Sequence, residues 1–199
     1  MLAAIVPAAG QSRRMGSAKQ LLPFAGTPVI GHIADQILAS RVEDVCVVLG
    51  HQADLVRQAL GGRPLHFAIN PDYERSDMLA SIRRGLAALP EHCRTILIAL
   101  GDQPSITAEL INAMHVAMAT TGRGIIVPIH GQRRGHPLLI DARFRAEILV
   151  SYDQVGLRGL LAARPDDVFE LPVQAPAVLC DIDYPKDYER ELVRQREKA

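Results

Sequence analysis

Residues 2–30, LAAIVPAAGQSRRMGSAKQLLPFAGTPVI, decide the fold of this chain. The stretch opens with an apolar run at residues 3–6, which is typical of a buried strand. That strand leads into a loop of small and cationic residues at 9–19. Small residues let a ligand approach the backbone closely, and free N–H groups in such a loop suit an anion. Three cations within seven positions, Arg13, Arg14 and Lys19, favour a polyphosphate over a single carboxylate.

The composition is that of an ordinary globular protein. The chain has 199 residues, of which 48% are hydrophobic and 22% charged, and this length predicts one domain over residues 1–199. Because 22 basic residues balance 22 acidic ones, no net field recruits nucleic acid or an anionic membrane. Aromatic residues are 4% and tryptophan is absent, which argues against a platform that stacks nucleic-acid bases.

The cysteines and the hydropathy of the chain indicate its compartment. The three cysteines are widely separated and never form CxxC, so a zinc or disulfide framework is not expected. Cys46 and Cys180 lie in apolar runs and are predicted to be reduced core residues. We find no secretory signal pattern and no run of about 18 apolar residues, so we expect a soluble cytoplasmic protein.

Strand-like and helix-like segments alternate along the chain. The predicted strands cover residues 3–8, 45–49, 65–69, 95–100, 124–129, 136–140, 168–171 and 177–180. The predicted helices cover 28–39, 53–60, 76–89, 108–118, 141–149, 155–163 and 185–198, with Thr27 and Thr107 as N-caps. This rhythm predicts an α/β fold of three layers (α/β/α) around a mainly parallel, Rossmann-like sheet. Residues 130–180 have more strand and less helix, and we expect an antiparallel piece there that forms one wall of a site.

Polar residues gather where predicted strands meet loops. They are the loop at 10–19, Asp102, the RGHP segment at 134–137 and the DID segment at 181–183. Ligands of open parallel sheets bind outside the carboxyl ends of the strands. The sequence therefore predicts that these four segments form one site.

Asp102 and Asp183 are candidate metal ligands. Asp102 follows a buried strand, where a carboxylate is a hard oxygen ligand for Mg²⁺ bound to phosphate. It could instead cap the next helix, although Thr107 already supplies a cap there. Asp183 could complete the metal site or start the last helix, and Asp181 could do either.

The remaining candidates concern charge and substrate. Arg14 and Lys19 would neutralise the charge that builds up on a leaving pyrophosphate. The loop matches neither the Walker A pattern nor the Rossmann GxGxxG pattern. His136 could orient a substrate or have a structural role. Without a Ser/His/Asp or Cys/His grouping, the sequence favours catalysis by positioning and metal electrostatics.

These segments resemble the molybdenum cofactor cytidylyltransferases, which are nucleotidyltransferases with a glycosyltransferase-A-like fold. The first stretch is similar to the family's AAGxSxRMGxxKxLLPxxGxP. The resemblance continues, in the family's order, through NP at 70–71, SIR at 81–83, GDQP at 101–104, RGHP at 134–137, GLRGLL at 156–161 and DIDYPKDYE at 181–189.

The resemblance implies that molybdopterin attacks the α-phosphate of CTP and that pyrophosphate leaves. Gly10, Arg14 and Lys19 would hold the triphosphate, with Arg14, Lys19 and Asp102 as the catalytic residues. Ala8 and Ala9 would line the base side, with Ser81 near the nucleotide. Asp102 and Asp183 would bind Mg²⁺, and His136 would face the acceptor. A molybdoenzyme would be the eventual recipient of the cofactor.

The chain departs from the family's pattern in two places. Asp77 stands where the family commonly has Gly, either near the base or facing solvent, and Tyr152 stands before Asp153 where Gly is frequent. AAG at 8–10, rather than the AGG of the guanylyl branch, favours CTP over GTP. Other hypotheses are a different acceptor, such as a sugar phosphate or methylerythritol phosphate, or a carrier that delivers the cofactor without turnover.

Overall fold

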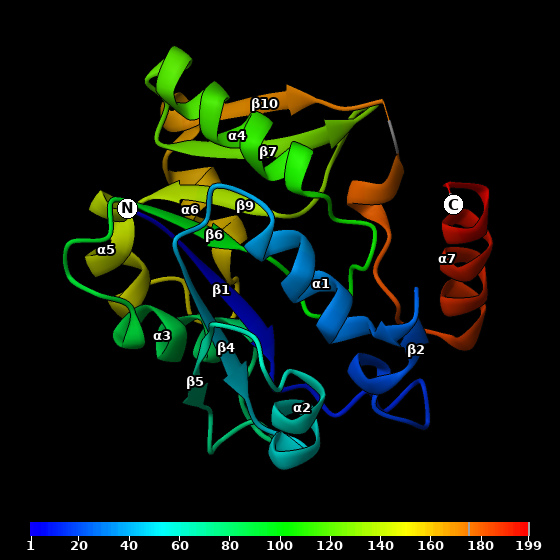
Figure 1. The fold of residues 1–199 in the computed structure, drawn as a ribbon. Coiled ribbons are helices and arrows are strands. Elements are labelled where there is room, and N and C mark those ends of the chain that lie inside the picture. The colour runs from blue at the N-terminus through cyan, green and yellow to red at the C-terminus, as the bar shows by residue number, and fades with distance from the viewer. Residues whose placement is uncertain (175, 199) are drawn as a thin grey trace.

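The computed structural model describes residues 1–174 and 176–198, and its centre is a mostly parallel sheet in the order β10-β7-β9-β6-β1-β4-β5, with β8 paired to β7 (Figure 1). The strands of this sheet are β1 (Leu2–Ala8), β4 (Asp44–Leu49), β5 (His66–Ile69), β6 (Thr95–Ile98), β7 (Ile125–His130), β8 (Arg133–Arg134), β9 (Leu138–Asp141) and β10 (Val168–Pro172). A two-stranded sheet, β2 (Pro23–Phe24) with β3 (Thr27–Pro28), follows the first loop.

Helices cover both faces of the sheet, as the sequence predicts. The α-helices are α1 (Val29–Leu38), α2 (Ala53–Ala59), α3 (Met78–Ala88), α4 (Ala108–Thr121), α5 (Arg145–Val150), α6 (Leu157–Ala163) and α7 (Pro185–Lys198). Short 3₁₀ turns occur at η1 (Lys19–Leu21), η2 (Ala142–Phe144), η3 (Pro165–Asp167) and η4 (Pro176–Leu179). Side chains of α1, α2 and α4 form the core on one face, and those of α3, α5 and α6 form the core on the other (Figure 1). The three-layer α/β/α prediction is confirmed.

β1 lies in the middle of the sheet and separates the two cores. Its alternate residues point to opposite faces, with Ala4 and Val6 in one core and Ala3 and Ile5 in the other. Parallel partners on both sides, β4 and β6, complete its hydrogen bonding. The carboxyl end of β1, which leads into the cationic loop, therefore lies next to the carboxyl ends of its neighbours.

β9 supplies the expected antiparallel piece. It pairs antiparallel with β6 and with β7, and Leu138 at its start lies opposite Ile98 at the end of β6. The residues that precede β9, His136 among them, therefore reach the same edge of the sheet as Asp102. Because β9 runs in the opposite direction to β6, the residues before β9 lie beside the residues that follow β6.

Two local predictions are wrong. Residues 177–180, predicted as a strand, lie mainly in the 3₁₀ turn η4. Thr27, predicted as an N-cap, lies in β3 instead, and Pro28 occupies the cap position of α1 without a side-chain bond. The Thr27 hydroxyl instead accepts a hydrogen bond from Arg63 at 3.4 Å. β3 pairs with β2, so a tertiary contact overrides the local capping signal.

Other caps follow the expected chemistry. Thr107 accepts a hydrogen bond from the Leu110 N–H at 3.2 Å, so it is the predicted N-cap of α4. Asp77, the departure from the family's pattern, caps α3 by accepting from the Ala80 N–H at 3.0 Å. One oxygen of the Asp77 carboxylate is thus committed to the helix.

The cysteines are only partly as predicted. Cys46 is buried, and burial raises the pKa of its thiol to about 12. Cys180, predicted as a core residue, is half-buried and lies beside Arg194 instead. Among the described residues, no helix combines the length and the apolar character needed to cross a membrane.

The contact between α3 and β1 leads to a stability prediction. Gly85 of α3 lies so close to Ile5 that an added Cβ would stand 2.4 Å from the Ile5 Cγ2 atom. We expect Gly85→Ala to lower the free energy of unfolding by about 1–2 kcal/mol, because overpacking outweighs the gain in helix propensity. Urea denaturation measures this change. Ala87→Ser on the exposed face of the same helix is the control, with a change of about 0.5 kcal/mol or less. Equal stability of Gly85→Ala and the parent chain would refute the packing argument.

Candidate active site

The loop after β1 folds back on itself and carries Lys19 toward the sheet. The Ser12 hydroxyl accepts a hydrogen bond from the Lys19 N–H at 3.3 Å and donates to the buried Gln20 side chain at 3.3 Å. Ser12 and Gly16 have positive φ angles of 52° and 68°. Gly10 has open space on the side where a Cβ would stand, so a ligand can reach the backbone there.

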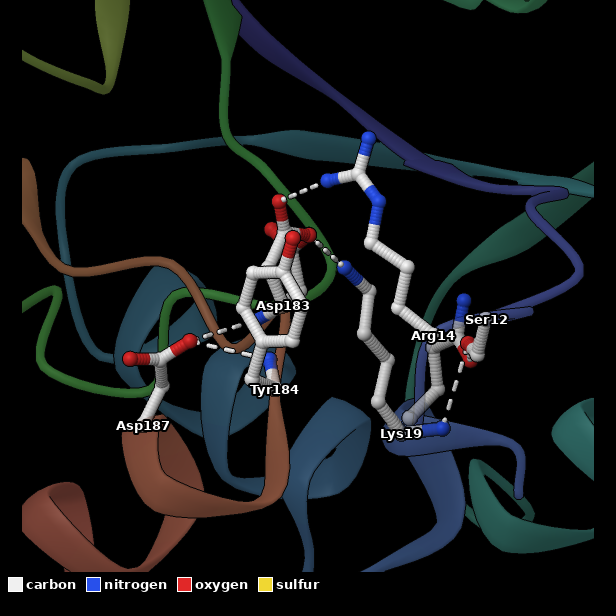
Figure 2. A network of polar contacts seen from close by, with 8 residues as sticks. Ser12, Arg14, Lys19, Asp183, Tyr184 and Asp187 are labelled. Atoms are coloured by element: carbon white, nitrogen blue, oxygen red, sulfur yellow. Dashed lines mark hydrogen bonds and ion pairs between the residues drawn. The ribbon is translucent and has the colours of Figure 1, made fainter. Parts of the chain in front are cut away.

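The Lys19 ammonium lies between two carboxylates. Its Nζ is 2.6 Å from Asp102 Oδ2. The same atom is 3.0 Å from Asp183 Oδ1 (Figure 2). Arg14 Nη1 lies 2.9 Å from Asp183 Oδ2. Burial alone lowers the pKa of Lys19, but the charges and hydrogen bonds of Asp102 and Asp183 outweigh it, so the pKa lies above its usual value. The structure thus brings together four predicted site residues from three distant segments.

Asp102 is held where β6 ends. Its carbonyl oxygen accepts a hydrogen bond from the Ile182 N–H at 3.0 Å, which joins the two carboxylate-bearing segments directly. Gly101 is required beside it, because an added Cβ would lie 2.9 Å from the Pro7 carbonyl oxygen. Asp102 Oδ1 is buried and has no hydrogen-bond partner within residues 1–174 and 176–198. Burial raises the pKa of Asp102 although Lys19 opposes the shift, so the site favours additional positive charge.

The structure distinguishes the two possible roles of Asp183. Asp187, not Asp183, accepts hydrogen bonds from the backbone N–H groups at the start of α7, from Asp183 at 3.3 Å and from Tyr184 at 2.8 Å (Figure 2). Both oxygens of Asp183 face Lys19 and Arg14 instead. Asp183 therefore pairs with the cations of the loop and does not cap the helix.

A cavity of about 510 Å³ opens over these charges. Of the predicted residues, Ala9, Gly10, Arg14, Lys19, Ser81, Asp102 and Asp183 line it. Ala8 does not: it is 1% exposed within β1, and the neighbouring Pro7 lines the cavity instead. Asp181 contributes to the same wall as Asp183.

Asn70 is a site residue to which the sequence analysis gave no role. It is 2% exposed and its Nδ2 donates to the hydroxyls of Ser76 and Ser81, each at 3.0 Å. This fixes Ser81 in the cavity wall. An amide directly after β5 and before Pro71 was the available signal, because polar groups buried at strand ends need partners.

His136 belongs to a second, adjoining cavity of about 780 Å³. Met78, Leu100 and Asp181 line both cavities. Apolar residues line the second cavity together with the polar residues Gln103, Arg133, Arg134, His136 and Arg158. His136 Nδ1 is buried, with no hydrogen-bond partner in the described part of the chain. Burial lowers the pKa of His136, and the charge of Asp181 opposes this shift only in part.

A metal ion at this site would have few protein ligands. Residues 1–174 and 176–198 contain no cluster of three or more His, Cys, Asp or Glu side chains arranged for a metal. Mg²⁺ is commonly held by one or two carboxylates, with water and substrate phosphates completing its shell. Asp102 and Asp183 fit this arrangement.

Comparison with known proteins places this geometry in a family. The sequence profile of the MobA-like NTP transferase domain matches residues 4–168. The chain belongs to the MobA-like NTP transferase family. The family is one of nucleotidyltransferases, as the resemblance in the sequence predicts.

Relatives of this MobA-like domain are named for different activities. Over 189 residues the chain is 24% identical to the molybdenum cofactor cytidylyltransferase of Escherichia coli K12, which covers 92% of each chain. Over 170 residues it is 31% identical to the nicotine blue oxidoreductase of Paenarthrobacter nicotinovorans, and this match covers 81% of each chain. The match to the bifunctional protein GlmU of Allorhizobium ampelinum, at 34% identity, covers 65% of this chain but only 29% of that one.

Solved structures share the fold over nearly the whole chain. A nucleotidyl transferase from Methanothermobacter thermautotroptrophicus has a TM-score of 0.86 at 24% identity and covers 100% of this chain and 99% of its own. A manganese complex of Rv0371C from Mycobacterium tuberculosis H37Rv has a TM-score of 0.79 at 26% identity, with 96% and 98% covered. The fold of the MobA-like domain is therefore that of a nucleotidyltransferase.

The low pKa of His136 leads to a prediction about stability and pH. In the unfolded chain His136 takes up a proton at about pH 6.5, before it does so in the folded protein. Its contribution to stability is therefore complete above about pH 6.5 and is lost as the pH falls through the lower, folded value. We expect His136→Gln to reduce the loss of unfolding free energy between about pH 7.5 and 5.5, by up to about 1.4 kcal/mol. Urea denaturation at the two pH values measures it, with the exposed His92→Gln as control. An unchanged pH dependence in His136→Gln would contradict the prediction.

Proposed function

We propose that the chain, as one nucleotidyltransferase domain over residues 1–199, transfers CMP from CTP to a molybdopterin-type acceptor and releases pyrophosphate. One observation carries the proposal: Arg14, Lys19, Asp102 and Asp183 converge in the wall of the first cavity, which adjoins a second one. A cavity with paired carboxylates and cations suits a triphosphate with a divalent cation. The second cavity offers room for an acceptor next to the α-phosphate.

Asp102 and Asp183 would hold Mg²⁺. The buried Asp102 Oδ1 atom has no partner among the described residues, which supports this assignment, because a buried carboxylate oxygen requires a donor or a cation. When bound, the ion would polarise the phosphate oxygens and neutralise part of their charge.

Lys19 and Arg14 would bind the triphosphate. Their present partners are the carboxylates of Asp102 and Asp183, so a divalent cation held by these carboxylates would leave the ammonium and the guanidinium available to the phosphates. They then stabilise the charge that develops on the departing pyrophosphate. Ala9, Gly10 and Ser81 would line the remainder of the nucleotide site.

His136 would orient the acceptor in the 780 Å³ cavity. Its neutral imidazole can donate or accept one hydrogen bond, and its free Nδ1 is available for this contact. The acceptor's own oxyanion attacks the α-phosphate in line with the leaving pyrophosphate, so no protein nucleophile is needed. The relative in Escherichia coli K12, a molybdenum cofactor cytidylyltransferase, supports this acceptor, and the recipient of the product would be a molybdoenzyme in the cytoplasm.

Substrate choice separates this proposal from its alternatives. Purified protein is incubated with each α-labelled nucleoside triphosphate and with molybdopterin, a sugar phosphate or methylerythritol phosphate as acceptor. We expect transfer from CTP to molybdopterin. Transfer from GTP, or turnover that requires a sugar phosphate and ignores molybdopterin, would assign the chain to one of the other nucleotidyltransferase activities.

Asp102→Asn tests the metal site. The substitution keeps the volume but removes the charge, so we expect kcat to fall by about 10²–10³. CTP with Mg²⁺ at about 1,000 times its Kd should stabilise the parent chain by about 4 kcal/mol, and this gain should be much smaller in the variant. Thermal unfolding with and without CTP and Mg²⁺ measures it. Asp54→Asn on the exposed first turn of α2 is the matched control. A protein that delivers cofactor equally well with Asn at position 102 would be a carrier rather than an enzyme.

A further inference from the structure

Helix α7 carries a buried carboxylate that the catalytic residues do not explain. Glu191 is 1% exposed, although most of this helix is polar and two other glutamates of α7, Glu189 and Glu197, are exposed. A carboxylate is rarely buried without charged or hydrogen-bonding partners, because its desolvation costs several kcal/mol. The partners of Glu191 therefore indicate its role.

Glu191 joins three other side chains into what we call the anchor cluster: Ser105, Cys180, Glu191 and Arg194. The Ser105 hydroxyl donates to Glu191 Oε2, and Arg194 Nη1 donates to Glu191 Oε1. The same Nη1 lies 2.7 Å from Cys180 Sγ. Both carboxylate oxygens of Glu191 therefore have hydrogen-bond partners. Glu191 links α7 to Ser105 directly and to Cys180 through Arg194.

The two linked segments carry the predicted metal ligands. Ser105 lies three residues after Asp102, and Cys180 lies three residues before Asp183. A third contact reaches the cationic loop, because the Tyr188 hydroxyl of α7 donates to the Pro23 carbonyl at 2.5 Å, four residues beyond Lys19. Lys19, Asp102 and Asp183 form what we call the ion cluster. Each of these three residues therefore lies on a segment that is hydrogen-bonded to α7. Figure 1 shows α7 at the edge of the molecule, beside β2.

We propose that Glu191 is a positioning residue, which sets the separation of Asp102 and Asp183 through the anchor cluster. Without the negative charge of Glu191, Arg194 loses its buried ionic partner and the Ser105 hydroxyl loses its charged acceptor. The direct bond from the Ile182 N–H to the Asp102 carbonyl and the Lys19 ammonium between the two carboxylates then remain to hold the segments together. The inference rests on the proposed function only in taking a divalent cation with CTP as the ligand of these carboxylates.

Glu191→Gln tests the inference, since glutamine keeps the volume and one acceptor but not the charge. We expect the Kd for Mn²⁺ in the presence of CTP, measured by electron paramagnetic resonance without acceptor, to rise about 10-fold, as for other residues that orient metal ligands. We expect kcat to fall with it, while KM for the acceptor stays unchanged. Ser105→Ala should act in the same direction with a smaller effect, and it provides the test if Glu191→Gln fails to fold. Glu189→Gln on the exposed side of α7 should leave all three constants unchanged.

The outcomes separate this inference from the proposed function. Parent protein that binds Mn²⁺ with CTP, and variants that bind it equally well but melt at a lower temperature, would reduce Glu191 to a stabilising residue and overturn the inference alone. Parent protein that binds neither Mn²⁺ nor CTP would overturn the proposed function and this inference together. Weaker Mn²⁺ binding at an unchanged melting temperature would confirm the positioning role.

Discussion

The ion cluster of Lys19 with Asp102 and Asp183 is the constraint on which the site depends. Each of these charges is partly removed from water, and an unpaired buried charge costs several kcal/mol. The fold therefore has to bring a loop after β1, a turn after β6 and the segment before α7 within ion-pair distance. The same ion pairs therefore explain why the cationic loop lies next to the two carboxylate segments and to the start of the terminal helix.

The sheet topology makes this convergence possible. β1, β4 and β6 run in parallel, so the loops that follow β1 and β6 emerge at one edge. β9 enters between β6 and β7 in the opposite direction and brings His136 to that edge from the other side. The antiparallel strand β9 thus places the second cavity beside the first within the same sheet.

The sequence predicted most of this arrangement, and its failures have physical causes. The strands around β1 and the convergence of Lys19 and Asp102 follow from apolar runs that end in polar residues, which is local information. The 3₁₀ turn at η4 was predicted as a strand, because an apolar run does not reveal whether a neighbouring strand is available for pairing. Thr27 failed as a cap because it pairs within the small sheet, and Asp183 could not be assigned until Asp187 was seen to cap α7. Glu191 was missed because its importance depends on burial, which a polar residue in a polar helix does not indicate. Asn70 was missed although its position directly after a strand was a signal.

Different segments of the chain line the two adjoining cavities. Residues 7–20 line only the smaller one and residues 127–161 only the larger one, while Met78, Leu100 and Asp181 form their common wall. Substitutions in the later stretch can reshape the larger cavity without moving the ion cluster. Different parts of the chain therefore supply the ion cluster and most of the larger cavity. Such a division would let the ligand of the larger cavity change during evolution while the ion cluster stays the same, which is consistent with relatives that have different names and activities.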